Sequence, residues 1–537
     1  MDKQTLSNYG WLVIVTLILA VMLAFATPFG TYVGDGVVSV ANGIVGTSND
    51  ATAEENISQE SVEWAVKTDY GIDYNTFKYY NTLEDAVEAV NNNSYITASS
   101  KLKNNNVVVG ISKDGNAPVV RLLSPIIVTD TISVEKSVTI DLNGYEFSTK
   151  NITQCFKLAN NIHFDICSNV KTKVLFNNVQ ALIDADNITK YNISIKNIDF
   201  YSTNDINSST DGLARVVYAF NNNGNKDENS LFVKDCTFNS NVIYATAFCK
   251  IKNATCEFNN LHININTNYV CYGLQLSSCD AKIQNCNFGI NVDLKFDKVE
   301  YSIAGAFLTN SNININDCNF DANFINYKNV DNNVKGIAML VARDNTILNA
   351  NNIKINCQGS GDVAFVAAQQ FNSDDFNGEI SEITLNNIDM KINETSNITP
   401  PSATAYSNSL LQCRSPGKHK IFNSKLEIKN DAEIMNSLVC TTGEGSEIIM
   451  DNVQFHSESV RKHDVLIAIS DMKDRTATNN IIKMSNIQSN SKYLYHFPNN
   501  KTNVIYKGIN CDIKYTDGIY YNYPENANII ETNEKYR

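Results

Sequence analysis

A phrase of about eight residues recurs along most of the chain and constrains the fold more than any other feature of the sequence. In its clearest copy, "ININDCNF", apolar residues alternate with asparagine or aspartate, a cysteine follows, and a phenylalanine closes the phrase. A period of two predicts a half-buried strand, because successive side chains of a strand point to opposite faces. Copies occupy residues 193–200, 231–238, 281–288, 313–320, 382–390, 447–455 and 481–489.

A second, more apolar phrase precedes many of these copies. Successive copies lie roughly 26 to 38 residues apart, except where residues 393–409 enlarge one interval. Two strands per unit at this period are typical of a solenoid or a propeller. The second phrase occupies residues 216–220, 242–248, 270–276, 303–308, 336–342, 363–368 and 465–470.

The spacing of turn residues favours the solenoid. Propeller blades have four strands joined by tight hairpins, for which Asn-Gly is the strongest signal. Here that dipeptide occurs only at Asn143-Gly144, Asn223-Gly224 and Asn377-Gly378. We therefore predict an all-β parallel β-helix, whose coils tolerate loops of uneven length at fixed corners.

Asparagine makes up roughly 15% of the chain, although it is a poor strand former. A β-helix accounts for this, because equivalent positions of successive coils stack and their amides can hydrogen-bond to one another. Asparagine also tolerates the left-handed backbone that sharp corners need. We expect the asparagines to mark the turns of the coils rather than the bodies of the strands.

A short amphipathic helix is predicted at residues 82–93, before the strands begin. Thr82 can cap it, and Asp85 stands in its first turn, where negative charge favours the helix start. Its apolar face, at spacings of three and four, consists of Leu83, Ala86, Val87 and Val90.

This helix and the strands that follow, including "VTIDLNGY" at residues 138–145, resemble the opening of pectin-lyase-like domains. The resemblance covers about residues 75–515. It implies a right-handed parallel β-helix with a helix capping the first coil. It implies no activity, because this architecture serves lyases, hydrolases, adhesins and structural proteins alike.

The first 45 residues form a separate segment. No charge occurs between Gln4 and Gly34, and about twenty apolar residues suffice to span a bilayer. One interpretation is an uncleaved membrane anchor, and another is a signal peptide cleaved after Ala24–Ala26. The apolar residues of this segment are Trp11, Leu12, Val13, Ile14, Val15, Leu17, Ile18, Leu19, Val21, Met22, Leu23 and Phe25.

A third interpretation comes from a second resemblance. Residues 7–44 resemble the amino-terminal helix of small Flp/Tad-type bacterial pilins, through Tyr9, Gly10 and residues 40–44. This chain has Asn8 where that family has a glutamate before the tyrosine. All three interpretations carry the rest of the chain across a membrane. The predicted domains are therefore the apolar helix at 1–45, a linker at 46–74, the β-helix at 75–515 and a tail or cap at 516–537.

Thirteen cysteines are spread along the chain, with no C-x-x-C pair and no histidine at metal-ligand spacing. Cys236, Cys286 and Cys318 take the same position in their repeats, so we expect them to lie near one another inside the coils. We predict buried thiols that fill the core. Disulfides and a metal site are the alternatives, and neither a metal nor a cofactor is expected.

A polysaccharide hydrolase of this fold would carry clustered aspartates with a histidine and basic residues on neighbouring coils. The candidates are Asp374 and Asp375 in a loop, and His463 beside Asp464 at a strand start. We expect the first pair to be solvated and the second to lie at the surface. Arginines are few and scattered, and no phosphate-binding loop or HExxH motif occurs.

Binding to a glycan is the other chemistry that the side chains suggest. Tyr218, Tyr244 and Tyr272 could stack on sugar rings if they aligned on one outer face, although packing between coils is the interpretation that we favour. The formal charge of −14 argues against nucleic acid, which requires a basic face.

These observations predict an exported bacterial cell-surface β-helix, attached by its amino-terminal helix. We expect it to act as a non-catalytic scaffold or adhesin-like module, with surface glycans or other surface proteins as partners. Two alternatives stay open. One is a polysaccharide lyase or hydrolase with an atypical site, and the other is a subunit of a pilus-like fibre.

Overall fold

A computed structural model describes the chain between residues 72 and 531. All of these residues belong to one compact unit, residues 66–537. Within this span it leaves out residues 96–105, 113–117, 151, 178, 205–213, 222, 243–244, 268–269, 294–303, 326–336, 360–362, 370–379, 395–406, 414–415, 431–434, 442–444, 460–463, 470–479, 492, 497–502, 510–511, 514–517 and 522–527.

The described part begins with a small antiparallel cap. Strands β1 (Ile72–Tyr80) and β3 (Pro118–Leu122) each pair in antiparallel fashion with β2 (Val107–Ser112). Helix α4 (Leu83–Asn91) lies between β1 and β2 in the chain and buries the apolar face that the sequence predicts. Thr82 caps it, because its Oγ1 accepts a hydrogen bond from the Asp85 backbone N–H at 3.1 Å.

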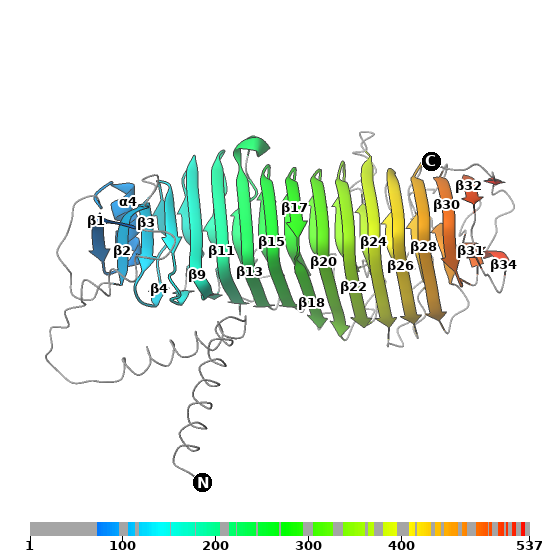
Figure 1. Ribbon diagram of the computed structural model, residues 1–537, viewed down its shortest axis with the longest axis horizontal. Helices are drawn as coiled ribbons and strands as arrows, with labels where there is room; N and C mark the ends of the chain where they lie inside the picture. Colours follow the sequence, from blue (N-terminus) through cyan, green and yellow to red (C-terminus); the bar gives the residue numbers. More distant parts are fainter. Residues whose placement is uncertain are drawn as a thin grey trace, which may run out of the picture. The chain divides into compact units, whose positions relative to one another are not determined.

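Beyond the cap, every strand pairing among the described residues is parallel, and the strands lie side by side in chain order (Figure 1). The chain alternates between two sheets, which share one apolar core. The second apolar phrase supplies the strands of the smaller sheet. They are β5 (Ile132–Val134), β8 (Gln154–Leu158), β10 (Ala181–Asp184), β12 (Ala214–Ala219), β14 (Ala245–Lys252), β16 (Val270–Ser277), β19 (Ala304–Thr309), β21 (Ile337–Arg343), β23 (Val363–Gln369), β25 (Ser407–Cys413), β27 (Met435–Thr441), β29 (Val465–Ile469), β31 (Tyr493–His496) and β34 (Gly518–Tyr521).

The larger sheet contains the longer strands, in which the asparagine-rich phrase lies. A short 3₁₀ helix, η1 (Lys226–Glu228), precedes one of them. The strands are β4 (Ile126–Val128), β6 (Val138–Asp141), β7 (Phe147–Thr149), β9 (Ile162–Asn177), β11 (Tyr191–Asn204), β13 (Ser230–Val242), β15 (Thr255–Thr267), β17 (Asp280–Gln284), β18 (Asn287–Asp293), β20 (Asn312–Ile325), β22 (Ile347–Gly359), β24 (Ser381–Glu394), β26 (Gly417–Asn430), β28 (Glu447–Ser459), β30 (Asn480–Ser489), β32 (Asn503–Ile509), β33 (Asp512–Ile513) and β35 (Asn528–Glu531).

Each long strand from β11 to β30 bends at one residue with a left-handed backbone. These residues are Asn197, Asp235, Asn260, Asp317, Asn352, Asn387, Asn423, Asn452 and Asn486, and Asn285 takes the same place between β17 and β18. Their side chains bond along the stack: the Asn387 Nδ2 donates to the Asn352 Oδ1 at 3.2 Å, and the Asn452 Nδ2 to the Asn423 Oδ1 at 2.8 Å.

The prediction that asparagine forms the corners is therefore confirmed, with one correction. The corner lies within a continuous long strand rather than at its end, because a single left-handed residue redirects the chain without ending the pairing on either side.

The residue after each corner points into the core. Cys236, Cys286 and Cys318 take this position, and the Cys286 backbone N–H approaches the Cys318 Sγ at 3.4 Å. Leu261 separates Cys236 from this pair. All twelve described cysteines are buried free thiols, which confirms the predicted role as core residues, and burial raises the pKa of the Cys236 thiol to about 12.

The aspartate of "IDLNG", Asp141, forms a buried ion pair with Arg121 of β3. The Arg121 Nε donates to the Asp141 Oδ2 at 2.8 Å, and both side chains are fully buried. The Asp141 Oδ1 accepts from the Asn143 backbone N–H, so the same carboxylate orders the Asn-Gly turn. The motif therefore ties one early coil to the cap strand β3.

Candidate functional site

The structure gives no support for catalysis at the sequence candidates that it describes. Asp374, Asp375 and His463 lie outside the described residues, as does the apolar segment from Trp11 to Phe25. In the part of the chain that is described, no helix is long and apolar enough to cross a membrane.

Asp464 is described, and the expectation that it lies at the surface is wrong. Its side chain is 2% exposed, and it accepts hydrogen bonds from the Ser457 Oγ at 2.6 Å and the Asn436 Nδ2 at 3.1 Å. The Asn436 Oδ1 in turn accepts from the Asn408 Nδ2 at 3.0 Å. Asp464 thus ends a buried row of amides at a coil corner, which gives it a structural role.

The tyrosines that we considered for sugar stacking do not form one platform. Tyr218 pairs in register with Lys250, whereas Tyr272 pairs with Ala304, so the two rings lie in different rows of the smaller sheet. The Tyr218 ring packs against the Arg215 guanidinium at 4.5 Å, and the Tyr272 ring meets Phe307 edge-on at 5.1 Å. Tyr244 lies outside the described residues.

A polar surface instead forms on the larger sheet, just beyond the corners of β11 to β20. The first outward position after each corner stacks in register through five coils. We call these residues the polar row: Asp199, Thr237, His262, Asn287 and Asn319.

Lys171 reaches this row from a local insertion in β9. The chain advances five residues from Cys167 to Thr172 in β9, whereas the paired segment of β11 advances only two, so β9 carries three additional residues. A hydrogen bond of 2.7 Å between the hydroxyls of Ser168 and Thr172 closes the insertion. The insertion places the Lys171 Nζ at 3.2 Å from the Thr237 Oγ1 and at 3.4 Å from the Asp199 Oδ1.

This ion pair is partly exposed. The Lys171 side chain is 42% exposed and that of Asp199 is 25% exposed. The Asp199 Oδ1, which faces Lys171, is itself buried and accepts no hydrogen bond among the described residues. A partly exposed pair of this kind contributes little to stability.

His262 is fixed as a neutral imidazole in the centre of the row. The Asn260 amide donates to Asp235, so its Oδ1 faces the His262 Nε2 at 3.1 Å as an acceptor. The Asn287 Nδ2 approaches the His262 Nδ1 at 3.0 Å as a donor. These partners assign the proton to Nε2. Burial and the nearby Lys171 charge lower the pKa of His262.

A second row runs beside the first, two residues further along each strand. Tyr201, Asn239, Asn264 and Gly289 follow one another in register. The Asn264 Nδ2 donates to the Asn239 Oδ1 at 3.0 Å, while a Cβ at Gly289 would lie 2.9 Å from the Asn264 Oδ1. The glycine therefore leaves room for this amide, and Tyr201 stands half-buried at the end of the row.

The same face changes character in later coils. From β24 to β28, its outward side chains form ion pairs, such as Lys391 with Glu427 at 3.6 Å and Lys429 with Glu458 at 3.3 Å. In the row itself, the charged residues Lys354, Asp389 and Lys425 follow Asn319 in register. Sequence reasoning missed this surface because its residues come from separate repeats, although alignment of the outward position after each corner would have grouped them.

Nothing in the described ranges forms a metal centre: no group of three or more His, Cys, Asp or Glu side chains there could hold a metal ion. No model of a known protein family and no curated protein matches the sequence. Among solved structures, the chain is similar to the A-module of the mannuronan C-5 epimerase AlgE4 from Azotobacter vinelandii. The identity is 10%, the match covers 73% of this chain and 90% of that chain, and the TM-score is 0.19. The fold assignment rests on the strand pairing.

Proposed function

We propose that this protein is a bacterial cell-surface scaffold that holds a glycan on the outer face of its larger sheet. One observation carries the proposal: Lys171, the polar row and Tyr201 form a continuous, fixed surface on consecutive coils. Attachment through the amino-terminal apolar helix and a right-handed sense of coiling, as the pectin-lyase-like resemblance implies, belong to the same proposal.

The chemistry of the rows suits a polyhydroxylated ligand. Asn264 and Asn319 each use one amide N–H to bond along the stack, which leaves a second N–H and a carbonyl lone pair for a ligand. Hydroxyl groups donate and accept, so they match such an alternating array. Because neighbouring side chains already fix the amides, little conformational freedom is lost on binding. Tyr201 adds an amphipathic ring.

The same geometry argues for holding the ligand rather than transforming it. A general base needs a free lone pair within reach of the proton that it abstracts. The Nδ1 lone pair of His262 already accepts from Asn287, and its Nε2 donates to Asn260. Lys171 pairs with Asp199 and Thr237. The ring nitrogens of His262 and the ammonium group of Lys171 are thus engaged with neighbouring side chains, an arrangement that suits holding a ligand.

Affinity electrophoresis of the full chain in mild detergent, against a panel of soluble polysaccharides, tests the proposal. We expect retardation by at least one glycan, and a tenfold or greater loss of affinity in Tyr201→Ala and in Asn264→Ala. Lys391→Met, on the ion-paired part of the same face, is the matched control and should bind normally. Equal binding by all variants would place the ligand elsewhere and refute the proposed surface.

The enzyme alternative is examined in the same samples by following the release of reducing ends and of unsaturated sugars. We expect neither. Polysaccharide degradation that disappears when Asp374 and Asp375 are both replaced by Asn would establish a hydrolase and overturn the non-catalytic role.

A further inference from the structure

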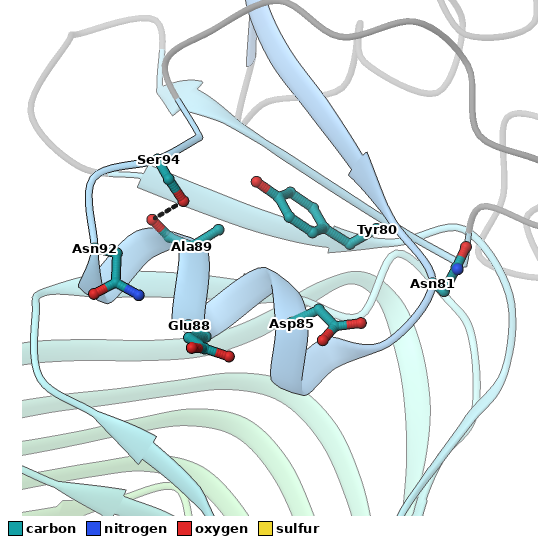
Figure 2. Close-up of a pocket in the computed structure, with 7 residues that line it drawn as sticks. All are labelled: Tyr80, Asn81, Asp85, Glu88, Ala89, Asn92 and Ser94. Atoms are coloured by element: carbon teal, nitrogen blue, oxygen red, sulfur yellow. Dashed lines mark hydrogen bonds between the residues drawn. The ribbon is translucent and has the colours of Figure 1, made fainter.

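A pocket of about 350 Å³ opens in the amino-terminal cap, away from the polar row. The end of β1, the face of α4 and the turn after the helix form its walls (Figure 2). Its volume is in the range of small-molecule sites and is far larger than a bare ion requires. It is lined by Tyr80, Asn81, Asp85, Glu88, Ala89, Asn92 and Ser94.

Two of the lining residues bring negative charge without compensation. Asp85 and Glu88 stand three residues apart on α4, and this spacing places them on the same face of the helix. Both are exposed, and neither forms an ion pair with a described residue. Among the described residues, Lys78 contacts the lining through the Tyr80 ring, with its Nζ 5.5 Å from the ring centroid.

Tyr80 provides an independent sign of a missing partner. Its side chain is only 9% exposed, yet its hydroxyl has no hydrogen-bond partner among the described residues. Figure 2 shows this hydroxyl directed toward Ser94, whose own hydroxyl donates to the Ala89 carbonyl at 3.4 Å. A buried polar group without a partner costs free energy, which a ligand that bonds to it recovers. Burial and the Asp85 charge raise the pKa of Tyr80 to about 12, so the hydroxyl stays protonated at neutral pH.

We propose that this pocket binds a small organic cation with primary ammonium groups. Ammonium groups would supply the positive charge that Asp85 and Glu88 lack, and their N–H donors match the carboxylates and the side-chain carbonyls of Asn81 and Asn92. The Tyr80 hydroxyl offers one more acceptor. The Tyr80 ring and the Ala89 methyl group give the alkyl part of the ligand an apolar contact.

Calorimetric titration of the full chain in detergent with 1,5-diaminopentane tests this inference. We expect saturable binding that weakens as salt is added, because the attraction is electrostatic. The uncharged 1,5-pentanediol, which has the same length, should not bind. Calcium chloride alone forms a separate arm of the experiment.

Three variants identify the site. Asp85→Asn combined with Glu88→Gln should lower the affinity at least tenfold, and Tyr80→Phe, which removes only the hydroxyl, should lower it several-fold. Glu135→Gln is the matched control, because Glu135 is exposed outside the pocket. An unchanged melting temperature shows that each variant is folded. Equal affinity in all variants, equal binding of the diol, or binding of calcium in place of the diamine would overturn the inference.

Discussion

At the scale of single residues, the most unusual group in the core is a histidine. His419 lies in β26 between Ile383 and Ile448 of the neighbouring coils, with 1% of its surface exposed. Neither ring nitrogen has a hydrogen-bond partner in the described part of the chain. Gly417 leaves space for the ring, because a Cβ there would lie 2.4 Å from the His419 Cε1. Burial lowers the pKa of His419 from 6.5 to about 4.

We expect His419→Ile to stabilise the protein. At pH 7 it removes two unsatisfied polar atoms from the core, a gain of about 1–3 kcal/mol. At lower pH the gain grows, because protonation of the unfolded chain below pH 6.5 favours unfolding until the folded histidine also titrates near pH 4. The difference between the two pKa values, 6.5 and about 4, corresponds to about 3 kcal/mol of unfolding free energy. Urea unfolding midpoints of the variant and the unaltered chain, measured between pH 7.5 and pH 4, test both the gain at pH 7 and its growth at lower pH.

Gln454→Ala is the control for this experiment, because Gln454 is exposed on β28 and has no titratable group. It should leave the unfolding midpoint and its pH dependence unchanged. If His419→Ile unfolded at the same urea concentration as the unaltered chain at every pH, the histidine would not be buried as described.

At the scale of the strand, the corner asparagine combines two functions. Asn352 adopts φ +56°, which a residue with a Cβ rarely does, and its side chain bonds to the coils on both sides. Asparagine is suited to this place because it tolerates the left-handed region and carries both a donor and an acceptor. Backbone conformation and stacking contacts can be separated by substitution.

We expect Asn352→Ala to destabilise the protein more than Asn352→Gly. Both lose the side-chain hydrogen bonds, at about 0.5–1.5 kcal/mol each. Alanine adds the left-handed penalty of about 1–2 kcal/mol, which glycine avoids. Hydrogen exchange of amides in β20, β22 and β24 measures the local opening free energy. Lys354→Ala, exposed in the same strand, should change it by less than about 0.5 kcal/mol. Equal protection in the alanine and glycine variants would contradict a role for the left-handed corner.

At the scale of the whole molecule, the proposed surface role depends on export and attachment. The uncharged stretch from Gln4 to Gly34, with the apolar residues Trp11 to Phe25 at its centre, is long enough for a membrane span and is separated from β1 by a polar, acidic stretch. We expect protein isolated from its own cells to keep this segment. Intact-mass and terminal-peptide analysis decides the matter. A mature chain that starts at or before residue 11 supports an anchored scaffold or fibre subunit, whereas a start at Thr27 would show a released protein and refute attachment.

The sequence by itself determined the solenoid, its asparagine corners, its buried thiols and its capping helix. These features follow from local properties: the period of apolar residues, the backbone tolerance of asparagine, and a helix cap within a few residues. The alternating pattern recurs in many coils, so each copy reinforces the prediction. The correction at the corners was small, because the pattern identifies the left-handed residue but not whether strand pairing continues across it.

Only the tertiary structure decided which side chains meet. Asp199, Thr237 and His262 come from different repeats, and strand register alone brings them into one row. Three additional residues in β9 place Lys171 above that row. Strand register also places Asp464 at the end of the buried row of amides that includes Asn436, rather than at the surface. Stacking in a solenoid joins residues that are distant in the chain, and the spacing within one repeat contains no record of the neighbour that the next coil provides.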